Sequence, residues 1–241
     1  MIFLFTDYGL QGPYIGQVET VLHQQAPNEK VIHLLTDAPR NKPKESAYLL
    51  ASLVSRIPEG SILFCVVDPG VGSDEDKPVM LKIDGRWYVG ADNGLFDILA
   101  RRASEIEAYE ITWKPKSLSN SFHGRDIYAP VCAMLANGED VPSTEYSWKD
   151  KHHWPDDLNQ IIYIDHFGNC MTGIRPESLD KQLILRADHQ EIVNADTFSD
   201  VKQGKALWYE NSNEMIEIAV NQGSAAEVLQ LEIGSHILLS T

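Results

Sequence analysis

Apolar residues in the first half of the chain alternate between short continuous runs and runs with helical spacing. Ile2–Phe5 is a short apolar run, whereas apolar residues within Tyr14–Gln25 recur every three or four positions. The run Ile62–Val67 is apolar throughout, which is typical of a strand covered on both faces. This alternation predicts an α/β fold.

The pattern gives bounds for each element of this half. Asp84-Gly85 between two apolar runs indicates a hairpin, so the predicted sheet is mixed and mainly parallel. The expected strands are Ile2–Phe5, Val31–Leu35, Ile62–Val67, Val79–Ile83, Trp87–Val89 and Glu107–Ile111, and the expected helices are Tyr14–Gln25, Lys44–Arg56, Gly94–Arg102 and Asp126–Asn137.

The composition changes near residue 138. Asn137–Asp157 is rich in charge and poor in aliphatic residues, and we interpret it as a linker or long loop. Short strands follow, with a weak helical stretch at Ala225–Leu229. We therefore expect an α/β domain over residues 1–150 and a small all-β, barrel-like domain over residues 157–241. The strands expected in the second half are Gln160–Ile164, Gln182–Arg186, Ala206–Glu210, Met215–Val220 and His236–Leu239.

Charge and cysteine content restrict the class of partner and the compartment. Twenty Lys and Arg against 35 Asp and Glu give a net charge of −15, which argues against nucleic acid or an anionic membrane as partner. No apolar run approaches the ~20 residues of a membrane-spanning helix, and the N-terminus has no basic leader. Cys65, Cys132 and Cys170 are odd in number without CxxC spacing, so we expect no disulfide framework and no metal site, a packing role for Cys65, and a cytoplasmic protein.

Two polar segments follow predicted strands. Asp7 lies in Thr6-Asp7-Tyr8-Gly9 after the first strand, and Asp68 begins Asp68-Pro69-Gly70-Val71-Gly72 after the third. Ligands of open α/β sheets lie beyond the carboxyl ends of strands, so both carboxylates are placed at one edge. Asp7 could accept two hydrogen bonds from a ribose diol, or it could be a turn residue. The second loop is no P-loop, because Gly-Lys-Ser/Thr does not follow.

Two further segments combine groups suited to a ligand. His123, Arg125 and Asp126 precede a predicted helix and offer a base, a donor fork and a cap, although Asp126 could simply cap the helix. In Asp165–Asn169, an aromatic residue followed by Gly-Asn could stack on a base and bond its edge, or form a bulge or hairpin. These patterns predict a nucleoside-like site without specifying a reaction.

The motifs together resemble a known family. The chain is similar to the S-adenosyl-L-methionine (SAM) hydroxide adenosyltransferases, the adenosine-forming SAM hydrolases, whose relatives are the fluorinases and chlorinases. The resemblance covers essentially the full length. It rests on Thr6-Asp7-Tyr8-Gly9, Val66-Val67-Asp68-Pro69-Gly70-Val71-Gly72, Asp92-Asn93-Gly94-Leu95, Phe122-His123-Gly124-Arg125-Asp126, Asp165-His166-Phe167-Gly168-Asn169, Asp196–Asp200, Asn211-Ser212, Glu217-Ile218-Ala219 and Gly223–Ala226, in the family's order.

The resemblance implies a fold, an assembly and a role for each motif. It implies an N-terminal α/β domain, a C-terminal β-barrel domain, and a homotrimer that binds SAM between subunits, with SAM as substrate and no cofactor or metal. Asp68 and His123 would activate water. The implied substrate-binding residues are Asp7 on the ribose hydroxyls, Phe167 and Asn169 on the adenine, Asp165 and Ser212 on the methionine group, and Tyr8, Asn93, Asn213 and Ala225.

The chain departs from the family pattern at several positions. Glu75 stands where the hydrolases usually carry Arg, with Lys77 close by in sequence. Gly12 replaces a common Asp, Gly173 a common Asn, and Asn213 stands where the halogenases have Arg. Two alternatives to SAM hydrolysis therefore stay open: a catalytically weakened SAM- or adenosine-binding protein, and a halogenase-like transferase acting at C5′.

Overall fold

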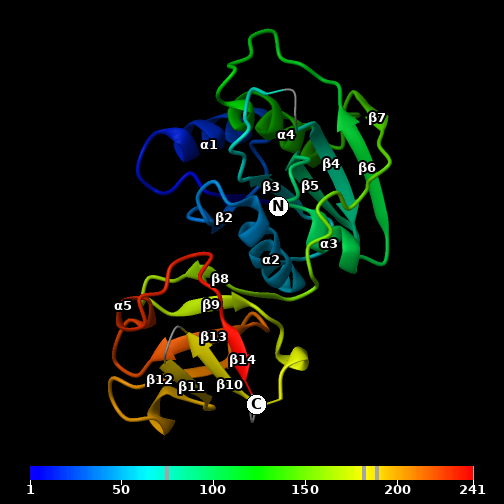
Figure 1. Ribbon diagram of the computed structural model, residues 1–241. Coiled ribbons are helices and arrows are strands. Elements are labelled where there is room, and N and C mark those ends of the chain that lie inside the picture. The colour runs from blue at the N-terminus through cyan, green and yellow to red at the C-terminus, as the bar shows by residue number, and fades with distance from the viewer. Residues whose placement is uncertain (74–75, 181–182, 188–189, 241) are drawn as a thin grey trace. The chain divides into compact units, whose positions relative to one another are not determined.

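A computed structural model describes residues 1–73, 76–180, 183–187 and 190–240 (Figure 1). The chain divides into two compact units. Unit 1 comprises Met1–Leu50 and Arg56–His153, and unit 2 comprises Ala51–Ser55 and Trp154–Thr241. Glu75 and Gln182, which the sequence analysis singled out, lie outside the described residues.

Unit 1 is built on a mixed seven-stranded sheet, which confirms the α/β prediction. The first three ladders of the sheet are parallel and the other three are antiparallel. The antiparallel part contains the expected hairpin and a strand inside the segment that we interpreted as a linker. The strand order is β2 (Val31–Leu35), β1 (Ile2–Thr6), β3 (Ile62–Val66), β5 (Arg86–Ala91), β4 (Pro78–Ile83), β6 (Ile106–Ile111) and β7 (Ser143–Glu145).

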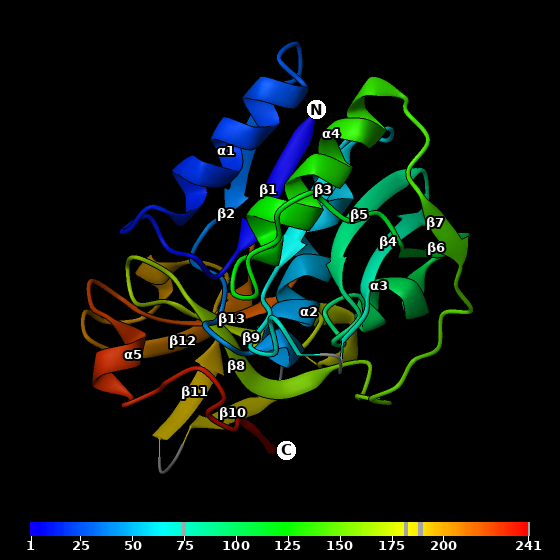
Figure 2. The same cartoon turned by 90° about the horizontal axis from the view of Figure 1, so that it is seen from above.

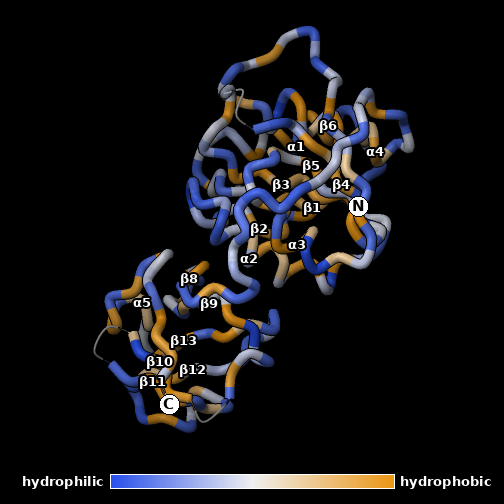
Figure 3. Tube along the Cα trace, turned by 45° about the vertical axis from the view of Figure 1, so that its right-hand side comes forward, coloured by the Kyte–Doolittle hydropathy of each residue, from blue (hydrophilic) through white to orange (hydrophobic). Residues whose placement is uncertain are grey.

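Helices cover both faces of this sheet. Figures 1 and 2 place α1 (Tyr14–Gln25) and α4 (Ala129–Asn137) side by side on one face, and α2 (Pro43–Leu53) and α3 (Asp97–Arg102) on the other. Every residue of β3 is buried, as predicted for a strand covered on both faces. The buried strands appear as the hydrophobic stretches of the tube in Figure 3.

Two expected helices differ in their local form. The helix predicted at Asp126–Asn137 starts as a π-helix, Gly124–Tyr128, before α4. Pro130 sits in the first turn of α4, a position that proline favours. The helix predicted at Lys44–Arg56 ends as a 3₁₀ turn at Val54–Arg56.

Unit 2 is a curled seven-stranded sheet that forms a half-barrel, which confirms the predicted β domain. The segment before β14 joins β8, because Ile237 N donates to Asn159 O (2.9 Å) and Ile161 N to Ser235 O (2.9 Å). Strands β9 and β11 were not predicted. The order is β14 (Leu238–Ser240), β10 (Ile184–Ala187), β11 (Gln190–Asn194), β12 (Ala206–Glu210), β13 (Ile216–Val220), β9 (Cys170–Gly173) and β8 (Leu158–Ile164), with α5 (Ala225–Val228) and 3₁₀ turns at Pro176–Ser178 and Phe198–Asp200.

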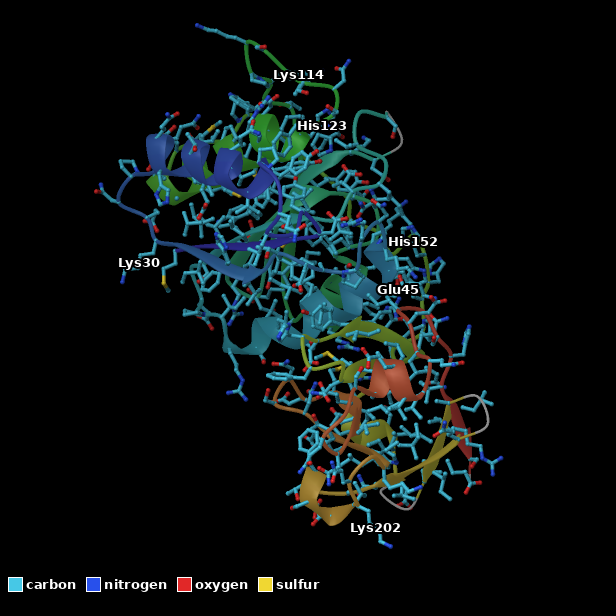
Figure 4. All side chains as sticks on the ribbon, turned by 90° about the vertical axis from the view of Figure 1, so that its left-hand side faces the viewer. Lys30, Glu45, Lys114, His123, His152 and Lys202 are labelled. Carbon is cyan, nitrogen blue, oxygen red and sulfur yellow. The ribbon has the colours of Figure 1, made fainter. Side chains whose placement is uncertain are left out.

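Two buried carboxylates anchor the segment after β7 to unit 1. Asp92, only 1% exposed, accepts hydrogen bonds from the Tyr146 hydroxyl (2.5 Å) and from Lys151 Nζ. Asp97, also 1% exposed, is bonded to His152 Nδ1 (2.8 Å), which is labelled in Figure 4. The stretch that we interpreted as a linker is therefore held in place by charged contacts.

We expect Lys151→Met to lower the free energy of unfolding of unit 1 by about 2 kcal/mol, because the buried Asp92 carboxylate loses its countercharge. The Lys151 side chain is 42% exposed, and solvent screening limits the size of this effect. Urea unfolding at pH 7 measures the change. Lys149→Met is the matched control, since Lys149 is exposed. Equal stability of the two variants would contradict the anchoring role of the Asp92 contact.

Candidate functional site

A cavity of about 440 Å³ opens at the carboxyl edge of the parallel strands in unit 1. Strands β1 and β3 pair in parallel with Thr6 opposite Val66, so Asp7 and Asp68 leave the sheet side by side. The structure thus brings Asp7, Asp68 and two more predicted residues together. The lining residues are Asp7, Tyr8, Gln11, Tyr14, Arg40, Asn41, Val66, Asp68, Val71, Ser121, Phe122, His123, Gly124 and Tyr128.

Asp68 is a partly buried carboxylate with an unusual charge environment. Gly70 N donates to its Oδ1 (3.0 Å). Burial raises the pKa of Asp68, and the negative charges of Asp76 and Asp7 add to this, while His123 and the Gly70 hydrogen bond oppose it. A carboxylate with a raised pKa is a stronger base than a surface carboxylate, which suits it to take a proton from water.

Asp7 is held by a loop that the sequence analysis did not single out. Asn41 N donates to Asp7 Oδ2 (3.0 Å). Burial raises the pKa of Asp7, and the Asn41 hydrogen bond and the Arg40 charge oppose that rise. This loop follows β2, the parallel neighbour of β1, so the same edge rule could have identified it. Asn41 has φ +57°, a conformation that Asn tolerates better than most residues.

His123 lies where the chain enters the π-helix before α4, and Figure 4 labels it there. π-helical turns are rare and are often found at functional sites. The next residue must be glycine, because a Cβ on Gly124 would lie 2.1 Å from the Tyr8 hydroxyl oxygen. Gly124 thus allows Tyr8 to reach the cavity wall beside His123.

Arg125 and Asp126 pair with each other and do not line the cavity. Arg125 Nε donates to Asp126 Oδ1 (2.6 Å), and its Nη1 donates to Gln17 Oε1 (2.8 Å). Asp126 also accepts from Ser119 N (2.8 Å), so it braces the preceding loop and does not cap the helix in the way we considered. Of the three polar residues of this motif, His123 is the one that lines the cavity.

The structure shows the surroundings of Lys77 and explains one departure from the family pattern, Gly12. Lys77 donates to Glu110 Oε2 (2.5 Å) and lies 5.5 Å from the centre of the Tyr146 ring, so its charge is engaged on β6. Gly12 has φ +106°, where a side chain such as that of Asp would be strained.

Asn93 is buried behind the cavity edge. Its Nδ2 donates to Val67 O (2.9 Å), and its Oδ1 accepts from Leu95 N (3.3 Å). The side chain therefore braces the residue that precedes Asp68. It does not line the cavity within the described part of the chain.

In unit 2, Asp165 builds the turn that presents Phe167 and Asn169. Its Oδ1 accepts from Phe167 N (2.9 Å) and Asn169 N (2.8 Å), and its Oδ2 accepts from Asn169 Nδ2 (3.0 Å). Gly168 packs against Ser224, whose Oγ would lie 2.1 Å from an added Cβ. Phe167 is 76% exposed, and among the ring pairs of the described residues its ring contacts only that of His166, with ring centroids 5.7 Å apart.

A hollow of about 410 Å³ adjoins this turn. One of its lining residues is Glu217, which is buried and accepts hydrogen bonds from the Tyr209 hydroxyl and from Asn211 Nδ2 (2.8 Å). The sequence analysis assigned no role to Glu217 or Tyr209. The lining residues are Tyr163, Asp165, Asn169, Met171, Tyr209, Asn211, Ser212, Asn213 and Glu217, which include four predicted positions.

The remaining positions in unit 2 are structural. Ala225 is fully buried at the start of α5, close to the turn because Ala226 N donates to Gly168 O (3.0 Å). A Cβ on Gly173 would lie 2.6 Å from Leu158 Cβ, which excludes the Asn common in the family.

The residues that the structure describes contain neither a metal-binding cluster nor a membrane-spanning helix. Among them, no group of three or more His, Cys, Asp or Glu side chains is arranged to hold a metal ion. No helix within the same residues has the length and apolar character needed to cross a membrane.

The fold and the two polar hollows define a class of protein with an α/β unit and a small β unit, each of which carries a polar hollow. Within that class, the chain belongs to the SAM hydroxide adenosyltransferase family. The family's N-terminal domain matches residues 2–145, and its C-terminal domain matches residues 159–238.

Several proteins are similar to this chain over nearly its whole length. An (R)-S-adenosyl-L-methionine hydrolase from Thermus thermophilus is 31% identical, covering 99% of this chain and 98% of its own. One from Salinispora arenicola is 33% identical over 96% and 94%. A fluorinase from Nocardia brasiliensis is 22% identical over 98% and 95%. The crystal structure of an uncharacterized conserved protein from Thermotoga maritima, 27% identical over 100% of both chains, superposes with a TM-score of 0.90.

Proposed function

We propose that this protein hydrolyses SAM to adenosine and L-methionine by in-line attack of water at C5′. The observation that carries the proposal is Asp68, a carboxylate with a raised pKa that shares its cavity with His123, in a chain of this family. Asp68 and His123 are the catalytic pair.

The chemistry needs few groups. The water oxygen forms a bond to C5′ while the C5′–S bond breaks and its electron pair passes to sulfur. One water proton goes to Asp68, with His123 beside it to orient the water and share the proton. Methionine leaves as a neutral thioether, so no acid is required and no cofactor enters the reaction.

The charge of the cavity supports a cationic substrate. The carboxylates of Asp7 and Asp68 repel each other when both are ionised. A sulfonium ion relieves that repulsion, and the reaction removes the positive charge. The cavity therefore favours SAM over its products, while Asp7 accepts hydrogen bonds from the ribose hydroxyls.

The rest of SAM is bound by unit 2. Phe167 stacks on the adenine, and Asn169 bonds its edge, because the Asp165 turn leaves Phe167 exposed and orients the amide. Ser212, on the adjoining hollow, contacts the methionine group. In the homotrimer that we propose, unit 1 of one subunit and unit 2 of the next form each site.

Mixing two inactive variants tests the shared site. His123→Ala damages only unit 1, and Asp165→Ala damages only unit 2. If subunits exchange at random, one interface in four has two intact halves, so activity returns to about a quarter of wild type. No recovery after verified subunit exchange, or a monomer in sedimentation at micromolar concentration, would rule out the shared site.

A SAM-binding protein with little turnover is the second candidate. It is favoured by the hydrogen bond between Lys77 and Glu110, because a lysine engaged in this way does not supply the charge of the family's Arg. Incubation with SAM of each sulfonium configuration, with and without added chloride, separates the candidates. Hydrolysis predicts adenosine in both conditions. Tight calorimetric binding without product would favour the binding protein, and 5′-chloro-5′-deoxyadenosine would favour the halogenase-like transferase.

A further inference from the structure

A buried tyrosine with no assigned role lines the unit 1 cavity. Tyr128, the last residue of the π-helix, is only 1% exposed. Its side chain borders the same cavity as Asp68 and His123. A phenol hydroxyl at a cavity wall can form a hydrogen bond to a molecule that occupies the cavity.

The surroundings of Tyr128 keep its phenol neutral. Burial raises its pKa, and the nearby Asp68, Tyr8 and Asp76 raise it further. The hydroxyl thus keeps its proton through the physiological range and offers one hydrogen-bond donor and an acceptor. Asp68 Oδ1 is already occupied by Gly70 N, which directs the second oxygen of Asp68 to other partners.

We propose that the Tyr128 hydroxyl positions the attacking water, as a second contact beside Asp68. The inference rests on the proposed hydrolysis. The water directs one proton to the Asp68 carboxylate and is held by Tyr128 through a second hydrogen bond, which leaves an oxygen lone pair facing C5′. The C5′–O bond then forms, the C5′–S electron pair passes to methionine sulfur, and the proton passes to Asp68.

A neutral hydroxyl suits this particular cavity. Lys77 is engaged by Glu110, and Arg125 is engaged by Asp126 and Gln17. A neutral donor and acceptor can fix the water without pairing with Asp68 as a cation would, so it does not lower the basicity of that carboxylate. Tyr128 is thus a positioning residue for the nucleophile.

Tyr128→Phe removes only the oxygen atom and tests the inference. We expect kcat for SAM to fall about tenfold, the loss of one well-placed hydrogen bond, with the Kd for SAM within about twofold of wild type. Tyr88→Phe is the matched control, because Tyr88 is equally buried, at 1% exposed, on β5 outside the cavity. Its kcat is expected to equal that of wild type.

A second measurement does not depend on how much of the variant folds. Azide offered with SAM competes with water: its nitrogen bonds to C5′ as methionine leaves, which gives 5′-azido-5′-deoxyadenosine. Since Tyr128 orients water, the ratio of azide product to adenosine rises about tenfold in Tyr128→Phe.

The possible results distinguish failure of the positioning role of Tyr128 from failure of the proposed SAM hydrolysis. Wild-type kcat and an unchanged product ratio in Tyr128→Phe overturn the positioning role while hydrolysis stands. A fall in kcat matched by equal weakening of SAM binding, with an unchanged ratio, also overturns it. Absence of adenosine from the wild-type protein, measured first, removes the proposed function and this inference with it.

Discussion

Asp68→Asn lowers kcat for SAM at least about 100-fold and raises the melting temperature at pH 7. In the proposed mechanism the carboxylate takes the proton from water, and the loss of a general base costs about 10²–10⁴-fold in rate. The same carboxylate destabilises the fold when ionised, because burial and the charges of Asp76 and Asp7 raise its pKa. The amide keeps an oxygen for Gly70 N and carries no charge, so stability rises as activity is lost.

The sign of the pH dependence follows from the raised pKa. The folded protein holds the Asp68 proton more tightly than the unfolded chain, so this group's contribution to stability is complete below the unfolded pKa and is lost as pH rises through the folded pKa. Activity runs the opposite way and rises with pH through that raised pKa. Asp140→Asn, at an exposed carboxylate, is the control. A variant Asp68→Asn with near wild-type kcat would remove Asp68 from the mechanism.

Asp165→Ala weakens SAM binding at least about 100-fold. The substitution removes the acceptor for Phe167 N, Asn169 N and the Asn169 amide at once, so the two residues that we propose to bind adenine lose their positions. Each hydrogen bond to a charged group contributes about 1.5–3 kcal/mol, so two losses suffice for such an effect. Calorimetric titration of SAM measures it.

Asp165→Asn distinguishes two roles of Asp165, the support of the turn and a charge contact with the substrate. The amide oxygen still accepts from the two backbone N–H groups, so the turn forms and binding weakens less than in Asp165→Ala. If both variants bind equally weakly, the charge of Asp165 acts on the substrate and the turn matters little. Phe167→Ala, which leaves the turn hydrogen bonds intact, reports the stacking contribution alone.

The sequence predicted the α/β part of the fold closely, because the central strand β3 is apolar throughout, the other predicted strands are rich in apolar residues, and the helices are periodic. Tyr14–Gln25 and Val31–Leu35 match the observed elements residue for residue. Strands β7 and β9 were not predicted, since each is short and one lies in a charged stretch without apolar alternation. Their pairing is fixed by neighbouring strands, a tertiary effect that local pattern does not encode.

The site was predictable where a motif follows a strand. Asp7 and Asp68 meet because β1 and β3 are parallel neighbours, and that follows from topology. Arg40 and Tyr128 were missed for different reasons. Arg40 lies in a loop whose partner strand had to be known first, whereas Tyr128 is hidden in an apolar helix where a tyrosine is typical of the core.

Hydrolysis of SAM in ¹⁸O-labelled water tests the central claim most directly. The account predicts adenosine that carries ¹⁸O on C5′, with an equal amount of unlabelled methionine, and loss of both products in Asp68→Asn. Unlabelled adenosine would contradict attack of solvent water at C5′. No adenosine above the protein-free control would contradict the hydrolase itself.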